Sequence, residues 1–194
     1  MADPAYIVDG VLTDGEAWVG LGTTTLGSDT ATVTFTSTDD GQVGDWSQYM
    51  DLVLVFYASC VNSGTPSALS FQINVNSDTS SSYPYQMLYG TGAAAGAWGS
   101  SGGRWNVGDT VGNATGTNYM GAGVMHLFDI NSGKYKSGVC QTVNDMDGSG
   151  SARVTGLTYT KQAAITEMTI GTGSPYLRAG SSFSLFGVLP RMVA

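Results

Sequence analysis

The sequence predicts an all-β protein, a jelly-roll-like antiparallel β-sandwich of about eight or nine strands. Apolar and polar residues alternate with a period of two in several short segments, as in LSFQINV at 69–75. Charged residues make up only 11% of the 194 residues, and glycine occurs 28 times. Long surface helices need Glu, Lys, Arg and Gln, whereas short strands and tight turns suit this composition.

Several segments carry the strand signal, and Gly-, Asn- and Ser-rich turns separate many of them. The segment 50–59 is almost continuously apolar, which favours a central strand with both faces covered. The segment 85–89 has the weakest pattern. The expected strands are 31–37, 50–59, 69–75, 85–89, 119–130, 134–143, 152–159, 164–170 and 182–189.

A chain of 194 residues suits one domain. Residues 1–30 are Gly-rich and poor in strand signals, so we expect an N-terminal arm there. Residues 31–194 are the predicted sandwich domain. A Gly-rich insert at about 90–118 is predicted to be a long loop or a loose ribbon, and loops of this length in compact domains are usually functional or mobile.

Charge and hydropathy exclude several classes of partner. The net charge is −8, and the seven Lys and Arg residues are scattered, so no nucleic acid is expected as a partner. No stretch of 18 or more apolar residues is present, and no membrane partner is expected. The start, MADPAY, lacks the basic and apolar regions of a secretory signal. Cys60 and Cys140 are therefore expected to be reduced and buried.

No catalytic residue or cofactor is expected. Residues 99–103 fit the pattern G-x-S-x-G around Ser101, but no helix follows, as a nucleophile elbow requires. His126 is the single histidine and lies in an apolar strand, which favours a packed or rim position. The run Gly90–Gly96 hints at a dinucleotide loop, but residues 97–103 cannot continue the helix that such a loop opens. We therefore expect that the protein is not an enzyme.

No metal site is expected either. The segment Asn144–Gly148 brings two carboxylates and an amide to a glycine turn. Val154 stands where the twelve-residue calcium loop needs its Glu, so a solvated turn is favoured. Paired carboxylates for sugar hydrolysis are not excluded by spacing, but no feature of the sequence singles out a pair.

The aromatic residues give candidate contacts. Tyr and Trp are enriched in protein interfaces, and carbohydrate-binding sandwiches stack sugars on exposed aromatic rings. Packing in the core or in an interface is the favoured interpretation of these rings. The residues that cluster in sequence around the insert, and that we treat as candidate interface or glycan contacts, are Tyr83, Tyr85, Tyr89, Trp98 and Trp105.

The order of segments carries a resemblance. TVTFTS, WSQYMDLVLVFYAS and LSFQINVNSDTSSSYPYQMLYGTGA are followed by VMHLFDINSGKYKSGVC and AITEMTIGTGSPYLRAGSSFSLFGV. This series resembles a β-sandwich family of bacteriophage virion structural proteins over roughly residues 31–190. Phe186 stands where the family usually has Tyr, and the insert and the first 30 residues depart from its pattern.

The resemblance implies a virion protein without catalytic residues, made in the host cytoplasm. The first hypothesis is a capsid decoration or cement protein on the head surface, partnered by the major capsid protein or other virion proteins. The alternative is a tail-fibre or minor tail protein whose glycan-binding module recognises a host surface glycan. A glycan hydrolase is a third and weaker hypothesis.

We also expect self-association as a homotrimer. Closed symmetry is the norm for soluble assemblies, and the sparse charge suggests that a monomer would expose apolar patches. The insert and the N-terminal arm are the expected contacts.

Overall fold

The computed structural model describes residues 7–8, 11–12, 18–61, 67–113, 119–146, 149–173 and 176–189. These residues form strands, together with one short 3-10 helix, η1 (Trp46–Gln48), and they contain no α-helix. No helix in this part of the chain is long and apolar enough to cross a membrane. The predicted all-β fold class is confirmed.

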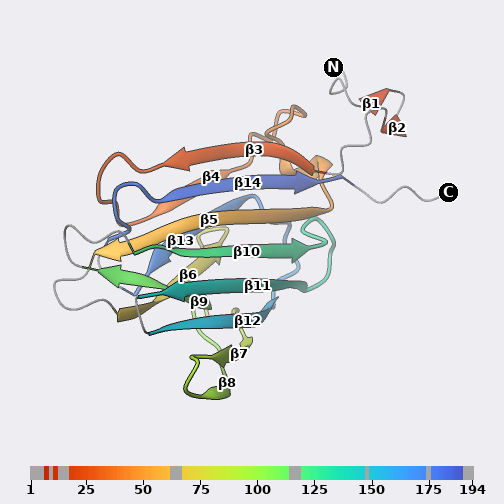
Figure 1. The fold of residues 1–194 in the computed structure, drawn as a ribbon. Coiled ribbons are helices and arrows are strands. Elements are labelled where there is room, and N and C mark those ends of the chain that lie inside the picture. The colour runs from red at the N-terminus through yellow and green to blue at the C-terminus, as the bar shows by residue number, and fades with distance from the viewer. Residues whose placement is uncertain are drawn as a thin grey trace.

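The strands form a sandwich of two layers (Figure 1). In spatial order, the larger layer contains β3 (Trp18–Thr25), β14 (Ser182–Val188), β5 (Asp51–Val61), β10 (Gly121–Phe128), β11 (Lys136–Asp145), β12 (Gly150–Tyr159), β7 (Tyr85–Gly90) and β8 (Ala95–Ser100). The smaller layer contains β4 (Val33–Thr36), β13 (Glu167–Thr172), β6 (Ser67–Val75) and β9 (Trp105–Asn113). A separate short pair is formed by β1 (Ile7–Val8) and β2 (Val11–Leu12).

Strand β5 joins the two layers. Most of its length pairs antiparallel with β14 and β10, while its last residues, Ser59–Val61, run parallel to Val111–Asn113 of β9. Twelve strands therefore belong to one continuous hydrogen-bonded sheet that folds over itself. Each side of the fold-over contributes an apolar face to one core.

The core lies between the layers and is rich in aromatic rings. Phe56 of the larger layer stacks on Phe71 of the smaller layer, with ring centroids 4.4 Å apart, and Phe183, the neighbour of Phe56 on β14, lies 6.2 Å from the Phe71 ring. All three side chains are buried. Aromatic pairs of this kind add about 0.5–1.5 kcal/mol each beyond the apolar area that they bury.

Each predicted strand segment overlaps an observed strand, but the predicted number is wrong. The described residues hold fourteen strands instead of eight or nine. Strands β8 and β9 lie inside the segment 90–118, so of the two expected forms the long loop is wrong for the described residues 90–113: β8 forms a ribbon with β7, and β9 is a core strand. Their sequences, AGAWGS and WNVGDTVGN, are rich in glycine and lack regular alternation, so tertiary pairing overrides the local signal.

The expectation of an arm over residues 1–30 also needs correction. From Trp18 to Thr25 the chain forms β3, which pairs along its length with β14. The Thr23 and Ser184 hydroxyls add a hydrogen bond of 3.1 Å between these strands. Most of the first 17 residues lie outside the described part of the chain, so the arm stays a prediction only there.

A buried lysine ties two loops to the end of the sandwich. The side chain of Lys136 is fully buried, and its Nζ donates to the backbone carbonyls of Ser132 and Lys134 at 2.6 Å and of Gln162 at 3.1 Å. Burial lowers the pKa of Lys136, although the carboxylate of Asp129 opposes this. The ammonium is occupied by backbone acceptors, which indicates a structural role.

Both cysteines are buried and unpaired, as the sequence predicts. Burial raises the pKa of the Cys60 thiol to about 12, and it raises the pKa of the Cys140 thiol as well. Since the thiolate is the reactive form, we expect iodoacetamide to modify neither residue of the folded protein within minutes at pH 8. In denaturant without reductant, intact-mass measurement should show two modified thiols. A denatured chain with none would instead indicate a disulfide.

Candidate functional site

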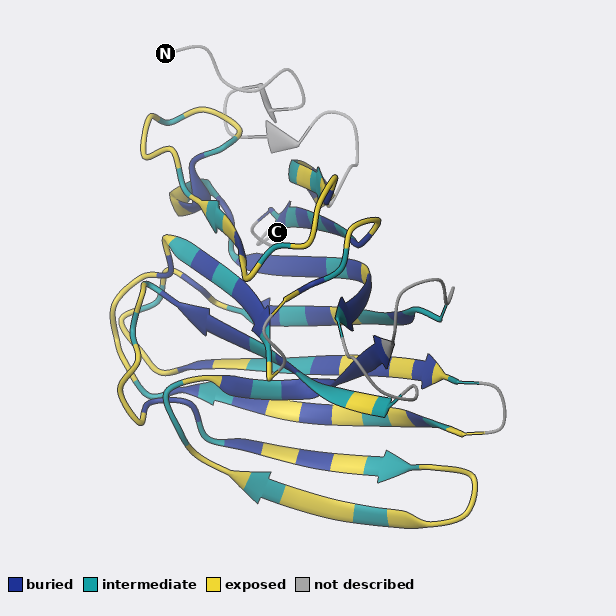
Figure 2. Cartoon of the chain, turned by 90° about the vertical axis from the view of Figure 1, so that its left-hand side faces the viewer, coloured by how far each residue is buried: buried dark blue, intermediate teal, exposed yellow. Residues whose placement is uncertain are grey.

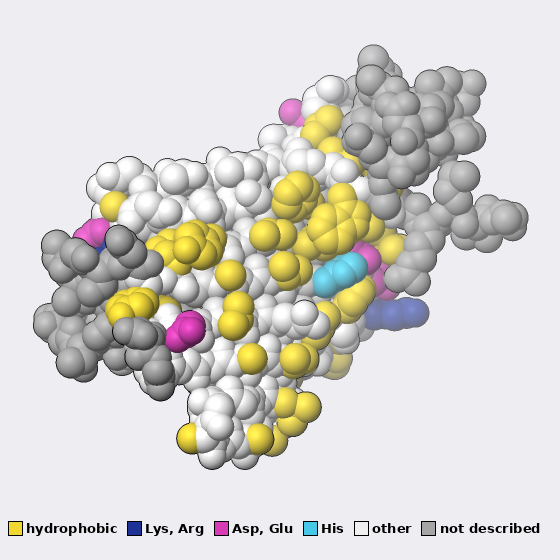
Figure 3. Space-filling view, viewed as in Figure 1, with side chains coloured by type: hydrophobic (Ala, Val, Ile, Leu, Met, Phe, Trp, Pro, Cys, Tyr) yellow, Lys and Arg dark blue, Asp and Glu magenta, His cyan; other side chains and the backbone are white. Residues whose placement is uncertain are grey.

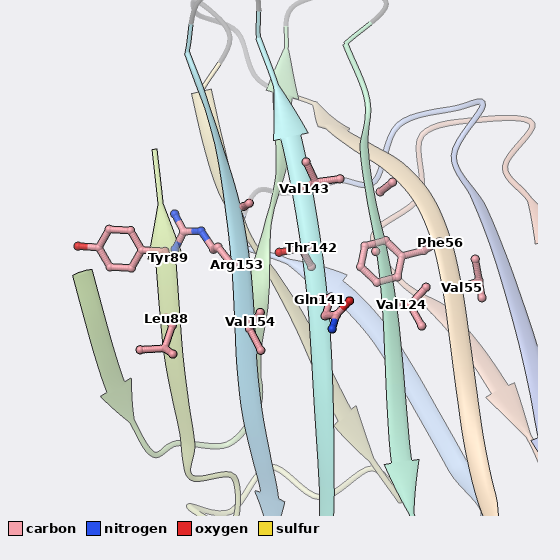
Figure 4. Close-up of a pocket in the computed structure, with 13 residues that line it drawn as sticks. Val55, Phe56, Leu88, Tyr89, Val124, Gln141, Thr142, Val143, Arg153 and Val154 are labelled. Carbon is pink, nitrogen blue, oxygen red and sulfur yellow. The ribbon is translucent and has the colours of Figure 1, made fainter. Parts of the chain in front are cut away.

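The outer face of the larger layer, turned away from the smaller layer, is apolar across five strands. The register places Val55, Val124, Gln141, Val154 and Leu88 side by side in one row. Figure 4 shows this row running across β5, β10, β11, β12 and β7. Three of these side chains remain well exposed, with Val124 at 41%, Val154 at 45% and Leu88 at 64% of their area.

A second row lies beside the first and continues the same chemistry. It contains Tyr57, Ala122, Val143, Ala152 and Gly90, again in register across neighbouring strands. Figure 3 shows hydrophobic side chains spread over this face. Between the large side chains, the small ones leave a shallow groove of about 750 Å³. We call the two rows together the outer apolar face.

An uncovered apolar face is unusual for an antiparallel sheet. Such sheets commonly pack one face on the core and present polar side chains on the other. The sequence of β5 predicts a strand with both faces covered, and its inner residues, such as Leu54 and Phe56, are buried. On the outer side Tyr57 is 52% exposed. Val53, on the same side, is fully buried, so the outer side of β5 is uncovered at Tyr57 and only partly covered at Val55.

The charged side chain that lies within this part of the sheet, Arg153, belongs to the inner side of the layer, whereas the His126–Asp51 pair lies on the outer side, beyond the end of the two rows. Arg153 lies on β12 between Ala152 and Val154, and its guanidinium forms an ion pair with Asp109 of β9. The Arg153 Nε also donates to Ser151 Oγ at 3.3 Å, and the guanidinium lies 5.3 Å from the centre of the Tyr89 ring. The ten positions of the two rows are uncharged.

The ion pair itself is largely withdrawn from solvent. The Asp109 side chain is 9% exposed and that of Arg153 is 17% exposed. Burial raises the pKa of Asp109, and the neighbouring Arg153 opposes that rise. The pair therefore joins the two layers and leaves the ten positions of the two rows free of charge.

The structure separates the five predicted aromatic contact residues. Tyr83 and Trp105 are fully buried and Tyr85 is 7% exposed, so these three belong to the core and cannot contact a glycan or a neighbouring protein at the surface. Trp105 donates from Nε1 to the carbonyl of Thr158 at 2.8 Å, and its ring meets Tyr83 edge to face. The assignment as candidate contacts is therefore wrong for Tyr83, Tyr85 and Trp105, which pack in the core.

Two aromatic residues of that set do reach the surface. Trp98 on β8 is 50% exposed and packs edge-on against Tyr85, with ring centroids 5.4 Å apart. Tyr89 on β7 is half-buried, and its ring covers Gly96 of the paired strand. These rings lie on the inner side of the β7–β8 ribbon and not on the outer apolar face.

The single histidine is held by a buried carboxylate. His126 Nε2 lies 2.9 Å from Asp51 Oδ2, and Asp51 Oδ1 accepts the backbone N–H of Asp129 at 2.8 Å. The imidazole stacks on Phe128, with ring centroids 4.1 Å apart. Ser101 follows β8, whereas His126 lies on β10, four strands away in the same layer. At about 4.8 Å per strand, the two strands are about 19 Å apart. The structure does not bring the serine and the histidine together.

The turn that was considered for calcium is used for folding instead. The Asn144 amide donates to Ser151 Oγ at 3.1 Å and accepts from the Ser151 N–H at 3.0 Å, which ties β11 to β12. Asp147 and Gly148 lie outside the described residues. Within the described part of the chain, no group of three or more His, Cys, Asp or Glu side chains is placed to hold a metal ion.

Sequence reasoning missed the outer apolar face because its residues look like core residues. Val124, Val143 and Val154 sit in strands whose two faces are both apolar in places, and a pattern of period two does not say which face meets the other layer. The available signal was an excess of apolar residues on both faces of β5, β10 and β12, more than one sandwich core can cover.

The chain was compared with protein-family models, with curated proteins and with solved structures. No family model matches the chain, no curated protein matches it, and no solved structure matches its fold. The case for a function therefore rests on the outer apolar face and on the sequence itself.

Proposed function

We propose that this protein is a structural component of a bacteriophage particle and acts by binding other protein subunits through the outer apolar face. The observation that carries the proposal is the uncharged surface that Tyr57, Leu88, Val124, Val143 and Val154 form across five strands. Contiguous exposed patches of this kind mark interaction sites on soluble proteins.

The chemistry of the face suits a permanent contact. Burial of valine, leucine and tyrosine side chains contributes roughly 25 cal/mol per Å² and depends little on salt, whereas exposed ion pairs are screened. With a flat sheet and a shallow groove, the partner is a protein surface that presents complementary apolar side chains. The phage assignment comes from the sequence resemblance over residues 31–190, and a head-surface decoration or cement protein is the form that we propose.

Labelling of intact particles tests the assignment directly. Gold-tagged antibodies against the purified chain should decorate the capsid of the phage that encodes it, as seen by electron microscopy. Label at the tail would overturn the head-surface proposal in favour of the tail-protein alternative. Particles without any label, although the chain is expressed during infection, would contradict a virion role.

A charge placed in the outer apolar face should abolish docking. In Val154→Asp a carboxylate would be buried without a partner, and we expect at least a tenfold weaker co-sedimentation with particles assembled without the chain. Ser137→Asp is the matched control, because Ser137 is exposed on β11 but outside the two rows. Equal binding of the two variants would rule out the outer apolar face as the docking surface.

A further inference from the structure

Strand β8 forms an open edge of the larger layer. It pairs with β7 on one side, and within the described residues no strand pairs with its other side. In Figure 2 the strand at the bottom edge is coloured mostly exposed or intermediate. Its sequence, AGAWGS, has no charge and no proline. Edge strands of monomeric proteins are normally protected by charged residues or proline. Because β8 has neither, it can serve as a template for strand pairing.

The register identifies the backbone groups that this edge offers. The hairpin turn is closed by a hydrogen bond from Thr91 N–H to the Ala94 carbonyl. Hydrogen-bonded and non-bonded pairs alternate from that turn, so Ala95, Ala97 and Gly99 occupy the non-bonded positions opposite β7. Their N–H and C=O groups therefore point away from β7, toward the open edge.

The side chains on the inner side of β8 alternate between small and large. Gly96 lies beneath the ring of Tyr89, and a Cβ atom at Gly96 would lie 2.7 Å from the Tyr89 hydroxyl. Trp98 is the one large side chain of the strand and is half exposed. A strand added at this edge would cover Trp98 on that side.

We propose that β8 pairs antiparallel with β8 of a second copy of this chain, around a twofold axis at Ala97. In this register Ala95 faces Gly99 of the partner, Ala97 faces its own copy, and Gly99 faces Ala95. All three outward-pointing residues of each strand are then hydrogen-bonded. A shift by two residues would leave one of the three without a partner, so the axis at Ala97 makes the largest number of bonds.

The same register explains why the occupant is a second copy. Trp98 falls opposite the partner's Gly96, and Gly96 falls opposite the partner's Trp98. Each indole therefore faces the Tyr89 ring that covers the partner's Gly96, so an aromatic contact forms on the inner side of the paired strands. The strand is thus complementary to itself in its backbone groups and in these aromatic contacts. A twofold contact of this kind is isologous and closes at two chains, unlike the trimer that composition alone favours.

Cysteine cross-linking tests the register. Residues that face each other across a hydrogen-bonded antiparallel pair have Cα atoms about 5.5 Å apart, within the range that a disulfide spans. Ala97→Cys should therefore cross-link more than about half of the chains into dimers under mild oxidation. Ala95→Cys is the matched control, because the two copies of residue 95 would lie about 14 Å apart. The native Cys60 and Cys140 are buried and should not contribute.

A backbone variant gives an independent readout. Ala97→Pro removes an N–H that points to the open edge and leaves the bonds to β7 in place. We expect a mass near twice 20.1 kDa for the unmodified protein and near 20.1 kDa for Ala97→Pro at the same concentration, while Ala97→Ser stays dimeric. A monomeric or trimeric unmodified protein, or equal cross-linking of Ala95→Cys and Ala97→Cys, would overturn the proposal. Docking through the outer apolar face would be unaffected by either result.

Discussion

Replacement of Trp105 by Ala is expected to lower the free energy of unfolding by about 3–5 kcal/mol. The side chain is fully buried between Tyr83 and Tyr159, and its loss leaves a cavity that the rigid sheet cannot close. It also leaves the carbonyl of Thr158 without the indole N–H that it accepts at 2.8 Å. Urea unfolding followed by circular dichroism measures the change.

The matched control is Trp18→Ala on β3, at an edge of the larger layer. Trp18 is 47% exposed, and its ring contacts Phe186 at a centroid distance of 6.0 Å. We expect a loss of about 1 kcal/mol or less, because half-exposed side chains leave little cavity. Equal losses of unfolding free energy for the two tryptophan variants would mean that Trp105 is not packed in the core.

The second large effect concerns the ion pair between the layers. Asp109→Asn should cost about 3–5 kcal/mol of stability, because it leaves the guanidinium of Arg153 buried without its counter-charge. Replacement of both residues, Asp109→Leu with Arg153→Met, should return the stability to within about 1 kcal/mol of the unmodified protein. Urea unfolding of Asp109→Leu, of Arg153→Met and of the double variant gives the coupling energy. Additive losses would show that the two side chains do not interact.

The pH dependence of the stability of Arg153→Met shows how the protonation of Asp109 contributes to folding. Burial raises the pKa of Asp109 above its ordinary value of 3.8, and Arg153 opposes that rise in the unmodified protein. Without the guanidinium the rise is larger, so the folded variant holds a proton that the unfolded chain releases. The contribution of Asp109 to the stability of this variant should therefore be fully present below about pH 4 and be lost as the pH rises through the raised pKa, which shows in the difference between the pH profiles of the variant and the unmodified protein. The unmodified protein should show a weaker fall over the same range.

The positions of most strands follow from the sequence, because alternation and turn residues mark them. The segment 69–75 shows this well, since its Phe71, Ile73 and Val75 are all fully buried in β6. The same reasoning did not predict strand β9. It contains a bulge, with Gly108 at a φ of 142° and a register shift opposite Phe71 and Gln72, and this breaks the alternation that a pattern could detect.

The candidate site was harder to predict, because one strand inverts the usual rule. In β12 the charged Arg153 points toward the core side and the apolar Val154 points outward. A reader of the sequence would assign these faces the other way round. The inversion depends on Asp109, which lies 44 positions earlier in the chain and reaches Arg153 only through the packing of β9. No local pattern contains that information.

The pairing of β3 with β14 has a consequence for synthesis. Thr23 and Ser184 are 161 positions apart, yet they sit side by side, and β14 lies between β3 and β5 in the finished layer. Ribosomes add about 5–20 residues per second, so roughly 8–32 s pass between the synthesis of β3 and that of β14, with which it pairs. Until then the backbone edge of β5 that will pair with β14 is unpaired on the nascent chain. Chaperone capture during translation should therefore protect this protein most between the emergence of β5 and that of β14.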